Sequence, residues 1–185
     1  MSFSYQLDFR GRSFIRGIKF TNDPNELSHL QHPQKPIQVK ISNPDDRDPW
    51  PTFEEVPVPF LSKHMYEVLL AAGVNNIDVY PVEISHPDGT IAPESDNYFV
   101  FNLLGAVAAV DLAKTVYDPN TQVASMISMS FDSLAVDESK AHGHLMFRLA
   151  ESLTTILVHE SVKAALEKAN IPLIEFYEPE YYAAL

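Results

Sequence analysis

The residues best suited to chemistry are two histidines in the segment His142-Gly143-His144. Alternate residues of a strand point to the same face, so a strand here would direct both imidazoles toward one metal ion. A zinc site needs at least a third protein ligand, and none is visible near this pair in the sequence. We therefore expect two ordinary polar histidines and no bound metal. A small metal-dependent hydrolase that uses His142 and His144 is the alternative.

Other residues that could support catalysis have simpler structural explanations. Ser62 and His159 hold matching positions at the starts of two expected helices, which favours N-capping over a Ser–His dyad, although His is a poor cap. Asp111 follows an apolar run, and we interpret it as a turn residue rather than a catalytic carboxylate. The sequence has no glycine-rich phosphate loop, no GxSxG elbow and no HExxH motif, and it contains no cysteine. We expect a protein that is not an enzyme and that uses no cofactor.

Two helix–turn–strand units are expected to position these residues. In each, four apolar residues follow the i, i+3, i+4, i+7 spacing of one helix face. The stripes are Met65, Val68, Leu69 and Ala72 in the first unit, and Val162, Ala165, Leu166 and Ala169 in the second. Gly73 or Asn170 then ends the helix, and a β-prone run follows at residues 77–80 or 174–177. The two units align without a gap, which is consistent either with an internal duplication or with a pattern common to many helices that precede strands.

The remaining apolar patterns indicate a fold rich in strands. Residues 98–104 form a near-continuous apolar run that suits the centre of a sheet, and residues 37–41 and 144–149 also predict strands. Residues 3–9 alternate, which predicts an edge or half-buried strand in a hairpin with residues 14–20. Because the strands cluster rather than alternate with helices, we expect an α+β fold. Its sheet would be mostly antiparallel or mixed, with two or more packed helices.

Length and charge limit the classes of function. A chain of 185 residues is enough for a single domain with a real core, so we expect residues 1–185 to form one domain. Its 13 Lys and Arg against 25 Asp and Glu give a formal net charge of −12. This charge disfavours nucleic acid and anionic membranes and suits a basic protein partner, although solubility alone would also explain it. The start lacks the apolar core of a secretory signal, and no run approaches the roughly 20 apolar residues of a membrane helix, so we expect a cytoplasmic protein.

Several stretches, taken in order, resemble a known family. They are LSKHMYEVLLAAG with IDVYPVEI, then YFVFNLLGAVAAVDLAKT, HLMFRLAE and ILVHESVKAALEKANIPLIEFYEP. The order resembles the immunity proteins of bacterial polymorphic-toxin systems, specifically the myxobacterial-type family that was long a domain family of unknown function. Within these stretches the resemblance depends on an aspartate–leucine pair, a lysine–serine-like end and a phenylalanine–arginine pair. Their places are filled here by Asp111, Leu112, Lys114, Thr115, Phe147 and Arg148.

The resemblance covers residues 56–179 and leaves residues 1–55 as a more variable strand and loop region. The chain departs from the family at His159, where serine is usual, and at residues 171–173, where Ile-Pro-Leu replaces a more usual threonine–glycine turn. The shared motifs are structural, so the resemblance implies a role rather than a catalytic mechanism. That role is cognate immunity: the protein would bind a co-encoded toxin and neutralise it.

An acidic partner-binding surface would suit this role, because charge complementarity speeds association with a basic toxin. Aromatic residues rimmed by charge are typical of tight interfaces, and the chain offers two such places, the loop around its single tryptophan and its C-terminal tail. The candidate contacts are Asp45, Asp46, Asp48, Trp50, Glu54, Glu55, Tyr181 and Tyr182. For the loop around Trp50, the competing interpretation is a solvated loop that a buried tryptophan holds in place. A scaffold protein that self-associates is the remaining alternative for the whole chain.

Overall fold

The computed structural model describes residues 3–8, 19–20, 35–40, 50, 52–54, 59–117 and 131–180, with the backbone alone for 3–8, 19–20 and 54. Its helices are α1 (Lys63–Ala71) and α2 (Glu160–Lys168), with the 3₁₀ helices η2 (Pro93–Asn97) and η3 (Glu138–Ala141). Its strands are β1 (Phe3–Asp8), β2 (Lys19–Phe20), β3 (Ile37–Lys40), β4 (Phe53–Glu54), β5 (Phe60–Ser62), β6 (Ile77–Ser85), β7 (Tyr98–Leu103), β8 (Ala106–Val107), β9 (Val116–Tyr117), β10 (Phe131–Ser133), β11 (Met146–Leu149), β12 (Ser152–His159) and β13 (Glu175–Tyr177).

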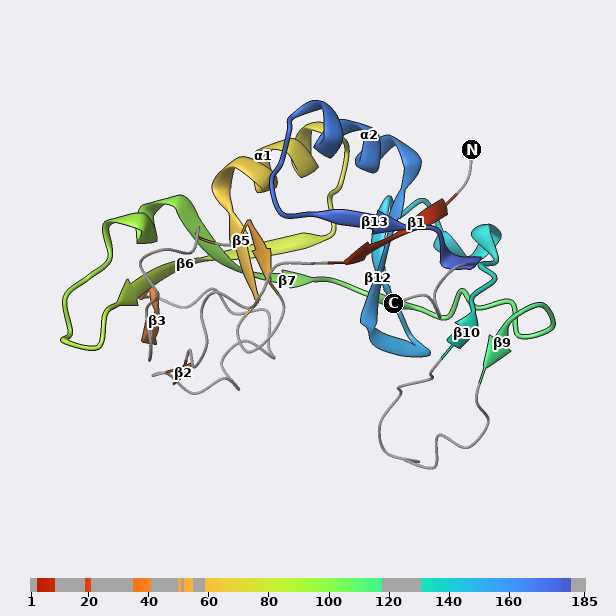
Figure 1. Ribbon diagram of the computed structural model, residues 1–185, viewed down its shortest axis with the longest axis horizontal. Coiled ribbons are helices and arrows are strands. Elements are labelled where there is room, and N and C mark those ends of the chain that lie inside the picture. Colours follow the sequence, from red (N-terminus) through yellow and green to blue (C-terminus); the bar gives the residue numbers. More distant parts are fainter. Residues whose placement is uncertain are drawn as a thin grey trace.

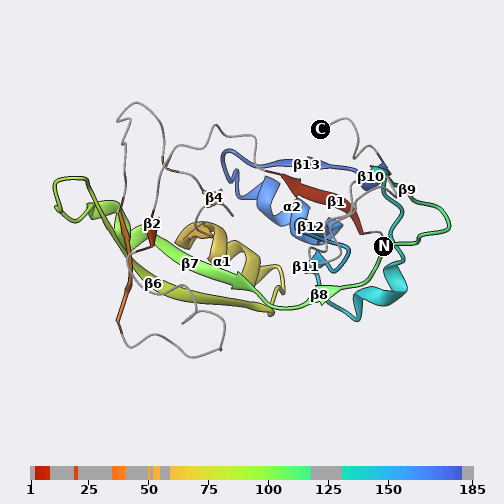
Figure 2. The ribbon, with the colours of Figure 1, turned by 90° about the horizontal axis from the view of Figure 1, so that it is seen from below.

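The strands form two large sheets and one small one, and the two α-helices lie side by side over the large sheets (Figures 1 and 2). One sheet has the order β2-β3-β6-β7-β5-β4 and the other β13-β1-β12-β11-β8, while β10 and β9 form a separate pair. Most pairs are antiparallel, and β3 with β6 and β8 with β11 are parallel. The α+β prediction is confirmed, and β7 lies inside its sheet, where the long apolar run placed it.

The two helix–turn–strand units end their helices in the same way. After each helix one residue takes a left-handed conformation, Gly73 with φ 94° and Asn170 with φ 53°. The following N–H then reaches back to the carbonyl of a buried leucine, which satisfies a helix-terminal acceptor in the manner of a Schellman motif. These bonds are Val74 N to Leu69 O at 3.0 Å and Ile171 N to Leu166 O at 3.2 Å.

The likeness of the two units extends to their strand pairing. In the first, β5 and β6 flank β7, which is antiparallel to both. In the second, β12 and β13 flank β1, again antiparallel to both. The registers match as well at these positions. Leu61 pairs with Phe99 and Val79 with Phe101 in the first unit, and the corresponding pairs in the second are Val158 with Tyr5 and Phe176 with Leu7. Each unit is thus a split β-α-β motif whose middle strand comes from elsewhere in the chain, after the unit in one case and before it in the other.

The predicted N-terminal hairpin is wrong. β1 belongs to the sheet with β12 and β13, where it is an interior strand rather than an edge, and β2 pairs with β3 in the other sheet. The alternating pattern of residues 3–9 correctly indicated a strand, but a period of two says nothing about the partner of that strand.

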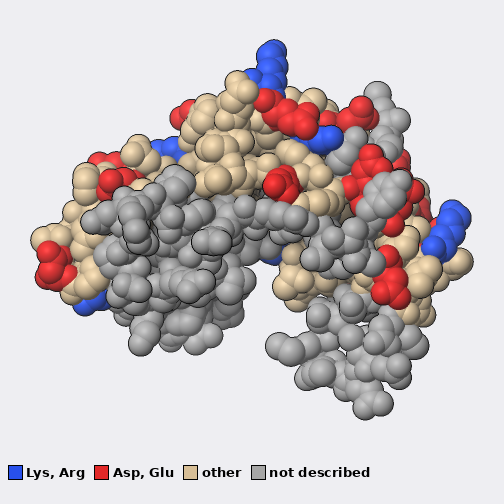
Figure 3. Space-filling model, viewed as in Figure 1, with Lys and Arg blue, Asp and Glu red and all other residues tan. Residues whose placement is uncertain are grey.

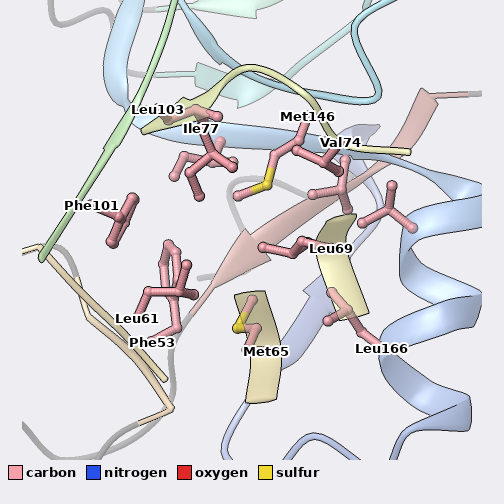
Figure 4. Close-up of a cluster of buried hydrophobic side chains, with 13 residues drawn as sticks. Phe53, Leu61, Met65, Leu69, Val74, Ile77, Phe101, Leu103, Met146 and Leu166 are labelled. Carbon is pink, nitrogen blue, oxygen red and sulfur yellow. The ribbon is translucent and has the colours of Figure 1, made fainter. Parts of the chain in front are cut away.

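One core joins both sheets to both helices. Met65 and Leu69 of α1 and Leu166 of α2 point toward Ile77 and Met146 from the two sheets (Figure 4). Two further clusters pack on the opposite faces of the sheets. The central strands are therefore covered on both faces, which explains why β7 and residues 156–158 of β12 are apolar with little alternation.

Candidate interaction surfaces

His142 and His144 do not lie on a strand. η3 ends at Ala141, and His142 caps it with φ 51°. Gly143 follows with φ 82°, and the His144 N–H donates to the carbonyl of Ala141 at 2.9 Å. These two left-handed residues make a turn, and β11 begins only at Met146. The alternation that would have directed both imidazoles to one metal ion is therefore absent. Within the described ranges, no group of three or more His, Asp or Glu side chains is arranged to hold a metal.

Ser62 and His159 both act as helix N-caps. The Ser62 hydroxyl accepts the N–H of Met65 at 3.2 Å, and Nδ1 of His159 accepts the N–H of Ser161 at 3.1 Å. Each side chain thereby satisfies a backbone donor of the first helical turn. The capping interpretation is confirmed for both residues.

Asp111 is the turn residue that its sequence context predicted. Its carboxylate accepts the N–H of Ala113 at 3.1 Å and contacts Nζ of Lys114 at 2.8 Å. The Lys114 hydrogen bond, together with the Lys114 charge and the Ala113 N–H, lowers the pKa of Asp111. A carboxylate held in this way remains ionised and organises the local backbone.

Trp50 lies against the outer face of the six-stranded sheet. Its half-buried ring sits 5.6 Å from the ring of Tyr98, which in turn meets Phe60 edge-on at 6.4 Å. Burial, with a smaller contribution from the charge of Glu94, raises the pKa of Tyr98 to about 12. The indole thus anchors this point of the chain to the sheet.

The other candidate contacts can be placed only in part. Glu54 belongs to β4, where its backbone pairs with Phe60. The remaining candidates, Asp45, Asp46, Asp48, Glu55, Tyr181 and Tyr182, lie outside the described residues.

A surface groove that we had not predicted lies between α2 and β13. It has a volume of about 360 Å³ and is lined by Lys163, Leu166, Glu167, Ile171, Ile174, Glu175, Phe176 and Tyr177. Half of these residues are apolar and pack on or belong to the central core. The sequence signal was present in residues 174–177, where an acidic residue interrupts an apolar strand, but nothing in it showed that β13 lies at the edge of a sheet.

The charges at this groove are mostly negative. Nζ of Lys163 lies 3.6 Å from Oε1 of Glu167 and 6.0 Å from the ring centre of Phe176, so this lysine is held inside the groove. Glu167 and Glu175 are exposed at its rim, and the Tyr177 hydroxyl donates to Glu175. Acidic side chains gather over α2 and the adjoining end of the molecule (Figure 3).

A known protein family matches most of the chain. In the described part of the chain, no helix is long and apolar enough to span a membrane. A search of curated proteins finds no match. The model of an immunity protein family, Imm11, matches residues 7–180. The match includes the first split β-α-β unit and all of the second except residues 3–6 of β1, and it starts well before the motifs at residues 56–179. The chain therefore belongs to the Imm11 family of immunity proteins.

Proposed function

We propose that this protein binds a co-encoded bacterial toxin and neutralises it by protein–protein contact, in the cytoplasm and without catalysing a reaction. The observation that carries the proposal is the family match over residues 7–180. The structural roles of Ser62, His159 and Asp111, each engaged in local backbone contacts, support a binding role rather than a catalytic one.

The net charge of −12 favours a basic toxin. Complementary charge raises the rate of encounter, which matters for an inhibitor that must reach its toxin before the toxin reaches its target. We propose the loop around Trp50 and the C-terminal tyrosines as contacts. The indole of Trp50 is already packed on Tyr98, and an aromatic contact residue that is placed before binding lowers the entropic cost of binding.

The test is co-expression with the reading frame next to the gene of this protein, with one of the two products tagged. We expect the neighbour to kill cells when expressed alone, and to be harmless and to co-purify in stoichiometric amount when this chain is present. A neighbour that neither co-purifies nor is neutralised would refute the proposal.

The contacts can be tested in the same assay by charge reversal. Asp46→Lys should reduce protection, whereas Asp96→Lys makes the same change in net charge at an exposed residue of η2 and should leave protection intact. Equal effects of the two variants would mean that only the overall charge matters and that the loop makes no contact.

A further inference from the structure

A second groove lies between α1 and α2, where the two repeated units meet. It has a volume of about 340 Å³ and is lined by Val68, Ala71, Ala72, Ala165, Lys168 and Ala169. In the alignment of the two units the first three of these residues correspond to the last three, so each unit contributes the same three positions. The lining is apolar except for the charged end of Lys168, and the groove is open to solvent.

The helix pair that carries this groove has no net charge, unlike the chain as a whole. The two glutamates of α2 are balanced by its two lysines, and Lys63 balances Glu67 in α1. The whole chain has a formal net charge of −12, so a second copy is repelled by most of the surface and meets no net charge on this face. A basic partner, in contrast, gains no net attraction here. The charge therefore favours a second copy of the chain as the occupant.

Two opposite charges on the two walls of the groove have no partner within one copy. Lys168 lines the groove, and Glu67 lies one helical turn before Ala71, so it shares the helix face that borders the groove. Both side chains are exposed, and neither forms an ion pair with any residue in the described part of the chain. A two-fold axis that brings Glu67 of one copy to Lys168 of the other also forms the reverse contact, because the interface is isologous.

We propose that the protein forms a homodimer through the α1–α2 face, with the two grooves packed together and Glu67 of each copy paired with Lys168 of the other. Removal of the apolar groove walls from water supplies the hydrophobic contribution to association. The helices cover the faces of the sheets that form the central core, whereas Trp50 packs on the outer face of the six-stranded sheet. The dimer therefore leaves the proposed toxin contact at Trp50 uncovered, and it does not depend on the proposed function.

The experiment is sedimentation equilibrium of the complete protein from about 1 to about 100 μM, where the average mass should rise toward twice that of one chain. Lys168→Glu and Glu67→Lys each place like charges in both contacts, so each should raise the dissociation constant of the dimer at least about tenfold. The double variant restores opposite charges with their places exchanged and should return to within about threefold of the original value. Lys40→Glu makes the same change in net charge as Lys168→Glu at an exposed residue of β3 and should change the dissociation constant by no more than about twofold.

Several results would overturn the proposal. The mass of a single chain at every concentration would exclude the dimer. Equal weakening by Lys168→Glu and Lys40→Glu would mean that only the overall charge matters, and a double variant as weak as the single ones would mean that Glu67 and Lys168 do not meet. A monomer whose binding to the product of the neighbouring reading frame is weakened by Lys168→Glu would identify the toxin, rather than a second copy, as the occupant of the groove.

Discussion

Asn76 joins the two large sheets, and its replacement is the sharpest test of the fold. It is 6% exposed, and its side-chain nitrogen donates to the carbonyl of Leu104 at 2.9 Å and to that of Met146, also at 2.9 Å. Leu104 directly follows β7 in the six-stranded sheet, and Met146 begins β11 in the five-stranded sheet. One amide group therefore connects the two sheets.

The expected cost follows from these two bonds. Asn76→Ala removes both, and at about 1 kcal/mol of net stability for each hydrogen bond it should lower the free energy of unfolding by about 2 kcal/mol. Asn76→Asp should cost more, because it places a carboxylate oxygen against two carbonyl oxygens in a buried site. For a chain of this size, a loss of 2 kcal/mol corresponds to a fall in melting temperature of about 4–8 °C.

The assay is equilibrium unfolding in urea followed by far-UV circular dichroism, with Asn75→Ala as the matched control. Asn75 is adjacent but exposed, so its replacement should change stability by no more than about 0.5 kcal/mol. If Asn76→Ala proved as mild as Asn75→Ala, the amide would not connect the sheets and the reasoning would be refuted.

Three further predictions concern the backbone, a cap and a titration. Leu173 has φ 61°, so Leu173→Gly should be more stable than Leu173→Ala by about 1 kcal/mol in urea unfolding, the reverse of the usual order, and the usual order would contradict a left-handed residue here. Ser62→Ala should lower the free energy of unfolding by about 1 kcal/mol because α1 loses its cap, whereas His159→Ser should not change it measurably because serine can also cap α2. Equal losses in the two variants would show that serine cannot replace His159 as a cap. The pKa of Tyr98 is raised from 10.0 to about 12. The unfolded chain therefore releases this proton first, so stability that is complete below pH 10 should fall as the pH rises from 10 to 12. Tyr98→Phe should lose less stability over that window, and an identical loss would mean that Tyr98 is not the group responsible.

Local structure followed closely from the sequence. The apolar stripes, the two caps and the left-handed residues after the helices all depend on neighbours within a few positions, and each occurs where its pattern indicated. The residue-by-residue correspondence between the two units was likewise visible in the sequence, because their helix ends and strands follow the same local patterns.

The pairing of strands that are far apart in the chain did not follow from the sequence. The partners of β1 lie at the opposite end of the chain, and the edge position of β13 depends on the order of strands in the whole sheet. The histidines illustrate the same limit at short range, since two left-handed residues turned an expected strand into a turn. Sequence reasoning found the aromatic anchor at Trp50 and missed the groove, because a groove is formed by elements that only tertiary contacts bring together.

The origin of the two middle strands has a consequence for the order of folding. β7 comes soon after β6, so the first unit can close as soon as its own segment has left the ribosome. The second unit needs β1, in which Leu7 pairs with Ile156 on one side and with Phe176 on the other. The first strand to be synthesised must therefore wait for nearly the last, and contacts of such high sequence separation are slow to form. Each newly made molecule should pass through a half-built stage in which the α1 unit is folded and the five-stranded sheet does not yet exist.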